Sequence, residues 1–169
     1  MTLLLALTVS IGVLAVVATW LFLGPLAVFG LQVWQLFIAW ASFYNQGGKT
    51  EGLTKTIICM SFGAIVGMLS VMLAGQLGAL GSFGVPVAVG LGAASLVLAA
   101  HIGVLSTIPA SVYGFASIAG LILLKGVTPL EAIAPTIGSI ILGAAFGWLS
   151  EALAGKLVST SIKPAPVRA

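Results

Sequence analysis

A stretch without any Asp, Glu, Lys or Arg, lying between Lys55 and Lys125, constrains this chain more than any other feature. It is mostly apolar and far too long to form one buried core helix. A transmembrane helix needs about 20 predominantly apolar residues, so the stretch predicts several consecutive membrane spans. Composition agrees, because 60% of the residues are hydrophobic and 5% are charged, too few charges to cover a soluble domain.

Glycine, proline and polar clusters divide the chain into six apolar segments. The breaks fall at 24–25, 45–52, 78–86, 106–109 and 125–129. The predicted spans are 3–23, 25–44, 55–76, 85–105, 109–124 and 130–153. We take 3–23 as a span rather than a signal peptide, because no Lys or Arg precedes its apolar core. Since 109–124 is short, the alternative is five spans plus a re-entrant segment at 106–124.

Positive charges favour six spans. With six spans, one side of the membrane carries Lys49, Lys55, Lys156, Lys163 and Arg168, and the other side carries Lys125 alone. Lys and Arg accumulate in cytoplasmic loops. Five spans would divide these cations equally and predict no orientation. We therefore expect six spans with both termini in the cytoplasm, and a cytoplasmic tail at 158–169.

One phrase occurs twice in the chain. GAIVGMLSVMLAGQL at 63–77 and GAAFGWLSEALAGKL at 143–157 share nine of fifteen residues. Because the copies lie on the third and sixth predicted spans, the repeating unit has three helices, and an odd number inverts the second unit. We expect an all-α integral membrane protein built from a repeat at 1–80 and an inverted repeat at 81–157.

The second and fifth predicted spans match more weakly. Pro25 to Gly30 and Pro109 to Gly114 share the pattern Pro-x-x-Val-aromatic-Gly, which predicts that each proline opens its helix. The first and fourth spans show no convincing match.

Small residues of the repeated phrase share one helix face. They are Gly63, Gly67 and Ser70 in the first copy, and Gly143, Gly147 and Ser150 in the second. Small faces let transmembrane helices approach closely. Helix packing is therefore the simplest interpretation, and an interface with a partner is the alternative.

Polar residues within the predicted spans are the candidates for a solute path. The main ones are Gln32, Gln35, His101, Ser106 and Thr107, with Pro25, Phe29, Pro109 and Tyr113 of the two proline turns. Lighter candidates are Thr8, Ser10, Thr19, Ser95, Ser111, Ser117, Thr136 and Ser139. An unpaired amide in hydrocarbon is costly, so the glutamines face either other helices or a water-filled path. His101 lies toward the end of its span, where an interfacial role is the simpler interpretation.

Catalytic and metal-binding motifs are missing from the sequence. It contains no HExxH, no GxSxG and no paired carboxylates within a span, and Cys59 has no obvious histidine partner. We therefore expect no enzyme activity, catalytic residue, metal or cofactor. A net charge of +3, scattered along the chain, does not suit nucleic acid.

The functional hypothesis follows from these exclusions. No carboxylate lies in the middle of a span, which disfavours ion-coupled transport. We expect a channel or facilitator for a small polar, uncharged solute, assembled as a homo-oligomer in the lipid bilayer. The alternative is a non-transporting membrane scaffold or accessory subunit.

Two segments resemble a known family. AWASFYNQGGKTEGLTKTIICMSFGAIVG at 39–67 and STIPASVYGFASIAG at 106–120 are similar to a small bacterial inner-membrane family, the domain of unknown function number one thousand and ninety-seven. The most specific pieces are Phe43 to Gly48 followed by Lys49, and Pro109 to Gly114 followed by Phe115 and Ala116. The resemblance implies a location in the bacterial inner (plasma) membrane and assigns no functional residues.

Overall fold

The computed structural model describes residues 1–160, so the predicted tail cations Lys163 and Arg168 lie outside the described residues. The α-helices in this range are α1 (Leu3–Leu23), α2 (Val33–Asn45), α3 (Lys49–Gln76), α4 (Gly84–Ala99), α5 (Ile108–Lys125) and α6 (Pro129–Thr160). Short 3-10 helices lie in the connections: η1 (Ala27–Phe29), η2 (Gly78–Phe83) and η3 (Gly103–Leu105).

Five helical segments are long and apolar enough to cross a bilayer. They are Leu3–Leu23, Lys49–Gln76, Gly78–Ala99, Ile108–Lys125 and Pro129–Val158. The protein is therefore a multi-pass membrane protein of the all-α class.

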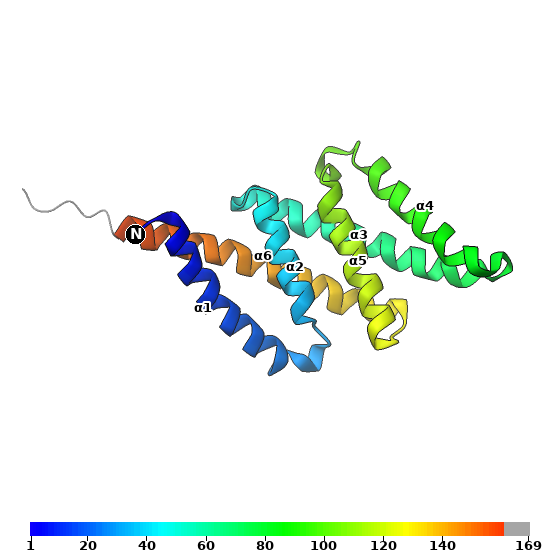
Figure 1. Ribbon diagram of the computed structural model, residues 1–169, viewed down its shortest axis with the longest axis horizontal. Coiled ribbons are helices and arrows are strands. Elements are labelled where there is room, and N and C mark those ends of the chain that lie inside the picture. The colour runs from blue at the N-terminus through cyan, green and yellow to red at the C-terminus, as the bar shows by residue number, and fades with distance from the viewer. Residues whose placement is uncertain (161–169) are drawn as a thin grey trace, which may run out of the picture.

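Two long helices form the centre of the molecule. Figure 1 shows α3 and α6 running in opposite directions, with α2 and α5 crossing them and α1 and α4 toward the two ends. The most extensive packing is between α3 and α5 and between α2 and α6. The two halves of the chain are thus interlocked, because the middle helix of each half packs on the long helix of the other.

The second predicted span, 25–44, is wrong at its start. Pro25 lies in the connection between α1 and α2, and α2 begins only at Val33. Gly30 turns the chain with a φ of 71°, in the left-handed region that favours glycine. The 13 residues of α2 extend about 20 Å at 1.5 Å per residue, less than the roughly 30 Å hydrocarbon core.

The other predicted spans correspond to helices: 3–23 agrees with α1 at both ends, whereas α3, α4 and α6 each have one clearly shifted end. α3 begins at Lys49 rather than 55, because Gly47 and Gly48, with φ of 88° and 71°, complete the turn by themselves. α4 ends at Ala99 rather than 105, and α6 continues to Thr160, beyond the expected start of a tail at 158. α5, the segment expected to be short, is a continuous helix of 18 residues.

α3 and α6 bury the same face. Every buried residue of α3 has a buried counterpart eighty positions later on α6. The α3 residues are Gly52, Thr56, Cys59, Met60, Gly63, Ala64, Gly67 and Ser70, and their counterparts are Ala132, Thr136, Ser139, Ile140, Gly143, Ala144, Gly147 and Ser150. The likeness of the two helices therefore extends well beyond the repeated phrase.

Glycines make the closest helix crossings possible. A Cβ added to Gly63 would overlap the backbone of Ser111 in α5, and one added to Gly143 would overlap the backbone of α2. Gly67 and Gly147, one turn further along, lie against side chains of the same two helices. The small faces thus pack within the chain, where a partner protein has no access to them.

Ser70 and Ser150, the last residues of the two small faces, make different contacts. Ser150 Oγ accepts a hydrogen bond of 3.1 Å from Trp40 Nε1 and lies 2.7 Å from the Tyr44 hydroxyl. Ser70 Oγ instead lies against Gly92 of α4. Ser150 on α6 therefore bonds side chains near the end of α2, whereas Ser70 on α3 lets α4 pack closely against α3.

α1 and α4 pack through narrow stripes at four-residue intervals. The buried residues are Ala6, Ser10, Leu14, Ala18 and Phe22 on α1, and Gly84, Ala88, Gly92 and Leu96 on α4. α1 packs mainly on α6, and α4 packs mainly on α3. Large apolar side chains such as Leu4, Val16 and Leu98 are exposed on the outer faces, as lipid contact requires.

Replacing Gly63 by Ala is expected to destabilise the fold, whereas replacing Gly12 by Ala is not. The methyl group at 63 meets a backbone that no rotamer change can move, so we expect the free energy of unfolding to fall by about 1–3 kcal/mol. At Gly12, on α1, the added methyl meets nothing within 4 Å, and alanine favours the helix. Thermal unfolding in mild detergent measures both variants, and equal midpoints would contradict the crossing.

Candidate functional site

A groove opens where α5 turns into α6. It has a volume of about 420 Å³ and is lined by Ala27, Gly30, Gln32, Leu121, Lys125, Val127, Glu131 and Pro135. These residues come from the α1–α2 connection, from the end of α5 and from the start of α6. We call this feature the polar groove.

Opposite charges lie at the rim of the polar groove. Glu131 Oε2 accepts hydrogen bonds from the Thr128 backbone N–H at 2.9 Å and from Thr128 Oγ1 at 2.8 Å. The Glu131 N–H donates back to Thr128 Oγ1 at 3.3 Å, which completes a capping box at the start of α6. Lys125, the last residue of α5, supplies the positive charge.

Gln32 shapes the rim rather than the centre. Its backbone N–H donates to Ser139 Oγ of α6 at 2.9 Å, and its Nε2 donates to the Gly30 carbonyl at 2.6 Å. Ser139 Oγ donates in turn to the Pro135 carbonyl at 2.8 Å. These contacts hold the irregular α1–α2 connection against α6 and satisfy the Gln32 N–H and the Gly30 carbonyl.

A buried polar cluster lies about one helical turn deeper. Gln35 Nε2 donates to the Ser117 carbonyl at 2.9 Å and to Thr136 Oγ1 at 3.2 Å. All three residues are fully buried, and they come from α2, α5 and α6. Gln35 follows the groove residue Gln32 by three positions, and Thr136 directly follows the groove residue Pro135. The cluster is therefore adjacent to the polar groove.

Two atoms of this cluster have no hydrogen-bond partner. They are Gln35 Oε1 and Ser117 Oγ, both buried; among the described residues Gln46 Nε2 and Ser111 Oγ, outside the cluster, are also buried without a partner. Leaving a buried polar group unpaired costs about 1–3 kcal/mol, and native structures seldom do so without a functional reason or a bound molecule. The cluster therefore has the polarity of a binding site as well as that of a helix contact.

In the first half of the chain, the hydroxyl that corresponds to Ser117 has a hydrogen-bond partner. Gly63 meets Ser111 and Gly143 meets Leu36, so Leu36 on α2 corresponds to Ser111 on α5. In this register Ser42 is the counterpart of Ser117, and Ser42 Oγ lies 3.2 Å from Thr56 Oγ1. The two halves therefore differ in their hydrogen bonding at this cluster.

The same register corrects the expected match between the two proline turns. Pro109 lies in the first turn of α5, whereas Pro25 precedes η1 and does not belong to α2. The tertiary contacts instead align Trp40-Ala-Ser-Phe43 with Phe115-Ala-Ser-Ile118. The shared proline pattern does not mark equivalent positions.

The family model described as Protein of unknown function (DUF1097) matches residues 8–155. The chain belongs to this family. The matched range contains the whole polar groove and the buried cluster. No curated protein and no solved structure matches the chain.

In this DUF1097 chain, several predicted solute residues lie away from the cluster. His101 is exposed in the turn after α4, with Nδ1 3.0 Å from the Leu98 carbonyl. Ser106 and Thr107 lie in the same connection, at the opposite end of α5 from Lys125. These three residues therefore do not join the glutamines.

The aromatic residues of the proline turns also lie apart. Phe29 is 66% exposed in η1. Tyr113 lines a separate groove of about 520 Å³ between α2 and α5, together with Ile38, Ala41, Asn45 and Ala116. Of the main predicted solute residues, only Gln32 and Gln35 lie at the groove and cluster, and the lighter candidates Ser117 and Thr136 join them there.

Sequence reasoning missed the charged residues of the rim. Lys125 entered only the count of cations on each side of the membrane, although the Thr-x-x-Glu spacing at 128–131 predicts a capping box with Glu131. Ser117 and Thr136 were two lighter candidates among eight. Periodicity does not show which of several serines and threonines meets a glutamine from another helix.

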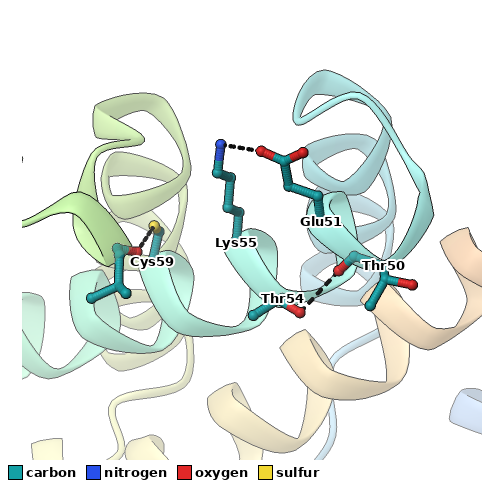
Figure 2. A network of polar contacts seen from close by, with 6 residues as sticks. Thr50, Glu51, Thr54, Lys55 and Cys59 are labelled. Carbon is teal, nitrogen blue, oxygen red and sulfur yellow. Dashed lines mark hydrogen bonds and ion pairs between the residues drawn. The ribbon is translucent and has the colours of Figure 1, made fainter.

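A second polar surface lies at the first turns of α3. Figure 2 shows Lys55 directed at Glu51 and the Cys59 thiol directed at a backbone carbonyl. Lys55 Nζ lies 2.7 Å from Glu51 Oε1, and Cys59 Sγ lies 3.4 Å from the Val104 carbonyl oxygen. A groove of about 350 Å³ lies beside these first turns of α3. Because the charged groups in Figure 2 pair with each other, this surface is a weaker site candidate.

A carboxylate from α6 caps the N-terminus of α3. Glu151 Oε2 accepts a hydrogen bond of 2.7 Å from the Lys49 backbone N–H, where negative charge suits a helix N-terminus. Among residues 1–160, no group of three or more His, Cys, Asp or Glu side chains is placed to hold a metal ion.

Replacing Gln35 by Leu is expected to weaken the fold without abolishing it. The variant loses two hydrogen bonds between helices, each worth about 0.6 kcal/mol on average in membrane proteins, so the unfolding free energy falls by about 1 kcal/mol. Gln32→Leu loses only the local bond to Gly30 and serves as the control. Thermal unfolding in detergent compares them, and complete loss of folded Gln35→Leu would show that the glutamine acts only as a helix contact.

Proposed function

We propose that the protein is a membrane channel or facilitator for a small polar, uncharged solute, with a path that includes the polar groove and the buried cluster. The observation that best supports this is the pair of unpaired buried atoms, Gln35 Oε1 and Ser117 Oγ, beside a groove lined by polar residues. A passing solute supplies the hydrogen bonds that the protein leaves unmade.

The proposed architecture is two inverted three-helix repeats, 1–80 and 81–157. Its support is the correspondence of contacts: α3 with α5 matches α6 with α2, and α1 with α6 matches α4 with α3. Inverted repeats of this kind commonly hold substrate near the bilayer midplane, where the repeats meet. In this architecture Ser42 of α2 and Ser117 of α5 are counterparts in the two middle helices.

A non-transporting scaffold is the weaker proposal. Its expected interfaces were the small faces of α3 and α6, and these faces are covered by α5 and α2 of the same chain. The outer faces of α1 and α4 carry large apolar side chains, which suits contact with lipid or with another copy in the proposed homo-oligomer.

Both termini are expected on the cytoplasmic side of a bacterial inner membrane. Lys49, Lys55 and Lys156 lie at one end of the helices and Lys125 at the other, in accord with the accumulation of cations in the cytoplasm. Reporter fusions at each terminus measure this arrangement, with a fusion after Gly126 as the periplasmic control. Termini on opposite sides would eliminate the inverted repeat.

Filling the polar groove is expected to block transport. Ala27→Trp places a large ring in the groove, whereas Val28→Trp changes a neighbour that is 82% exposed and lies outside the groove lining. Proteoliposome swelling with a panel of small neutral solutes measures flux. Ala27→Trp should lower the flux about tenfold or more, which corresponds to a barrier raised by about 1.4 kcal/mol. Val28→Trp should leave the flux unchanged. Equal flux in both variants would exclude this groove from the path.

A further inference from the structure

We infer that the buried cluster selects neutral solutes that carry an N–H or O–H donor, an inference that rests on the proposed function. The orientation of the Gln35 amide is the starting observation. Its Nε2 already donates to the Ser117 carbonyl and to Thr136 Oγ1, at 2.9 and 3.2 Å. An amide nitrogen has two N–H donors, so both are used, and only the acceptor Oε1 remains for a guest.

The second free group is the Ser117 hydroxyl. Its Oγ is buried and has no hydrogen-bond partner, and a hydroxyl both donates and accepts. The cluster therefore offers two acceptors and one donor. A guest that brings an N–H or O–H group can satisfy Gln35 Oε1, whereas a guest with acceptors alone leaves that oxygen unpaired. A site with a buried polar group discriminates strongly against molecules that cannot pair it.

Charge excludes ions from this guest class. Gln35, Ser117 and Thr136 are all neutral. Of the described carboxylates, Glu51 and Glu131 lie in the first turns of α3 and α6, and Glu151 bonds the backbone at the start of α3. A cation in a low-dielectric centre needs a counter-charge, and an anion would face the partial negative charge of Oε1. Small amides, polyols and water fit the cluster.

The first half of the chain supplies an internal control for this inference. Ser42 corresponds to Ser117, but its hydroxyl is paired with Thr56 at 3.2 Å. In the same register Ala110 of α5 occupies the place that Gln35 has in α2. Ser117→Ala and Ser42→Ala are therefore matched deletions of one hydroxyl, and only the first removes an unpaired group.

The experiment compares wild type, Ser117→Ala and Ser42→Ala in proteoliposomes by stopped-flow light scattering. The probes are urea, which carries N–H donors, and trimethylamine N-oxide, which is uncharged overall and carries none. We expect wild type to conduct urea well above protein-free vesicles and trimethylamine N-oxide at their level. Ser117→Ala should lower urea flux about 2- to 12-fold, as the loss of one hydrogen bond predicts, with an unchanged unfolding midpoint.

Ser42→Ala should show the opposite pattern, a lower unfolding midpoint with unchanged urea flux per folded protein. Equal conduction of both probes by wild type would overturn the inference and leave the proposed function standing. The same holds if Ser117→Ala changes urea flux no more than Ser42→Ala, since the cluster would then hold a structural water only. If neither probe nor any solute of the panel passes faster than through protein-free vesicles, the proposed function fails, and the inference fails with it.

Discussion

The fold depends on the close contact of two glycine faces with two crossing helices. Lipid tails are as apolar as the side chains they touch, so helices in a membrane associate mainly through close packing and polar contacts between helices. Gly63 and Gly143 let α5 and α2 approach the backbones of α3 and α6. Each half of the chain therefore holds the middle helix of the other half, and this exchange places α2 beside α6.

The polar cluster is a consequence of that arrangement. Only because α2 lies between α5 and α6 does the Gln35 amide reach Ser117 and Thr136. The packing of the two halves corresponds closely, but the polar groups do not, since Ser42 and Thr56 pair while Ser117 Oγ stays unpaired. Correspondence of the packing positions accounts for stability, and the presence of Gln35 in α2, where α5 has Ala110, accounts for the candidate site.

The shortness of α2 has a related cause. The chain between Leu23 and Val33 is irregular, and irregular backbone at membrane depth needs protein or water to satisfy its polar groups. Ser139 and the side chain of Gln32 meet part of this need, and the polar groove lies beside the segment. A short helix and a polar groove at one position are therefore two aspects of the same local structure.

The sequence by itself determined the membrane class, the positions of most helix ends and the eighty-residue repeat, because hydropathy, turn residues and repeated letters are properties of neighbouring positions. It also singled out Gln35 as a polar residue in an apolar segment. Only the tertiary structure decided that α2 begins at Val33 and that Ser117 and Thr136 are the partners of Gln35. It also decided that Ser42 of α2 corresponds to Ser117 of α5, whereas the two proline turns do not correspond. These facts depend on contacts between residues far apart in the sequence, such as Gly63 with Ser111 and Gly143 with Leu36. Such contacts depend on the distances between helix backbones, and a local sequence pattern does not predict these distances.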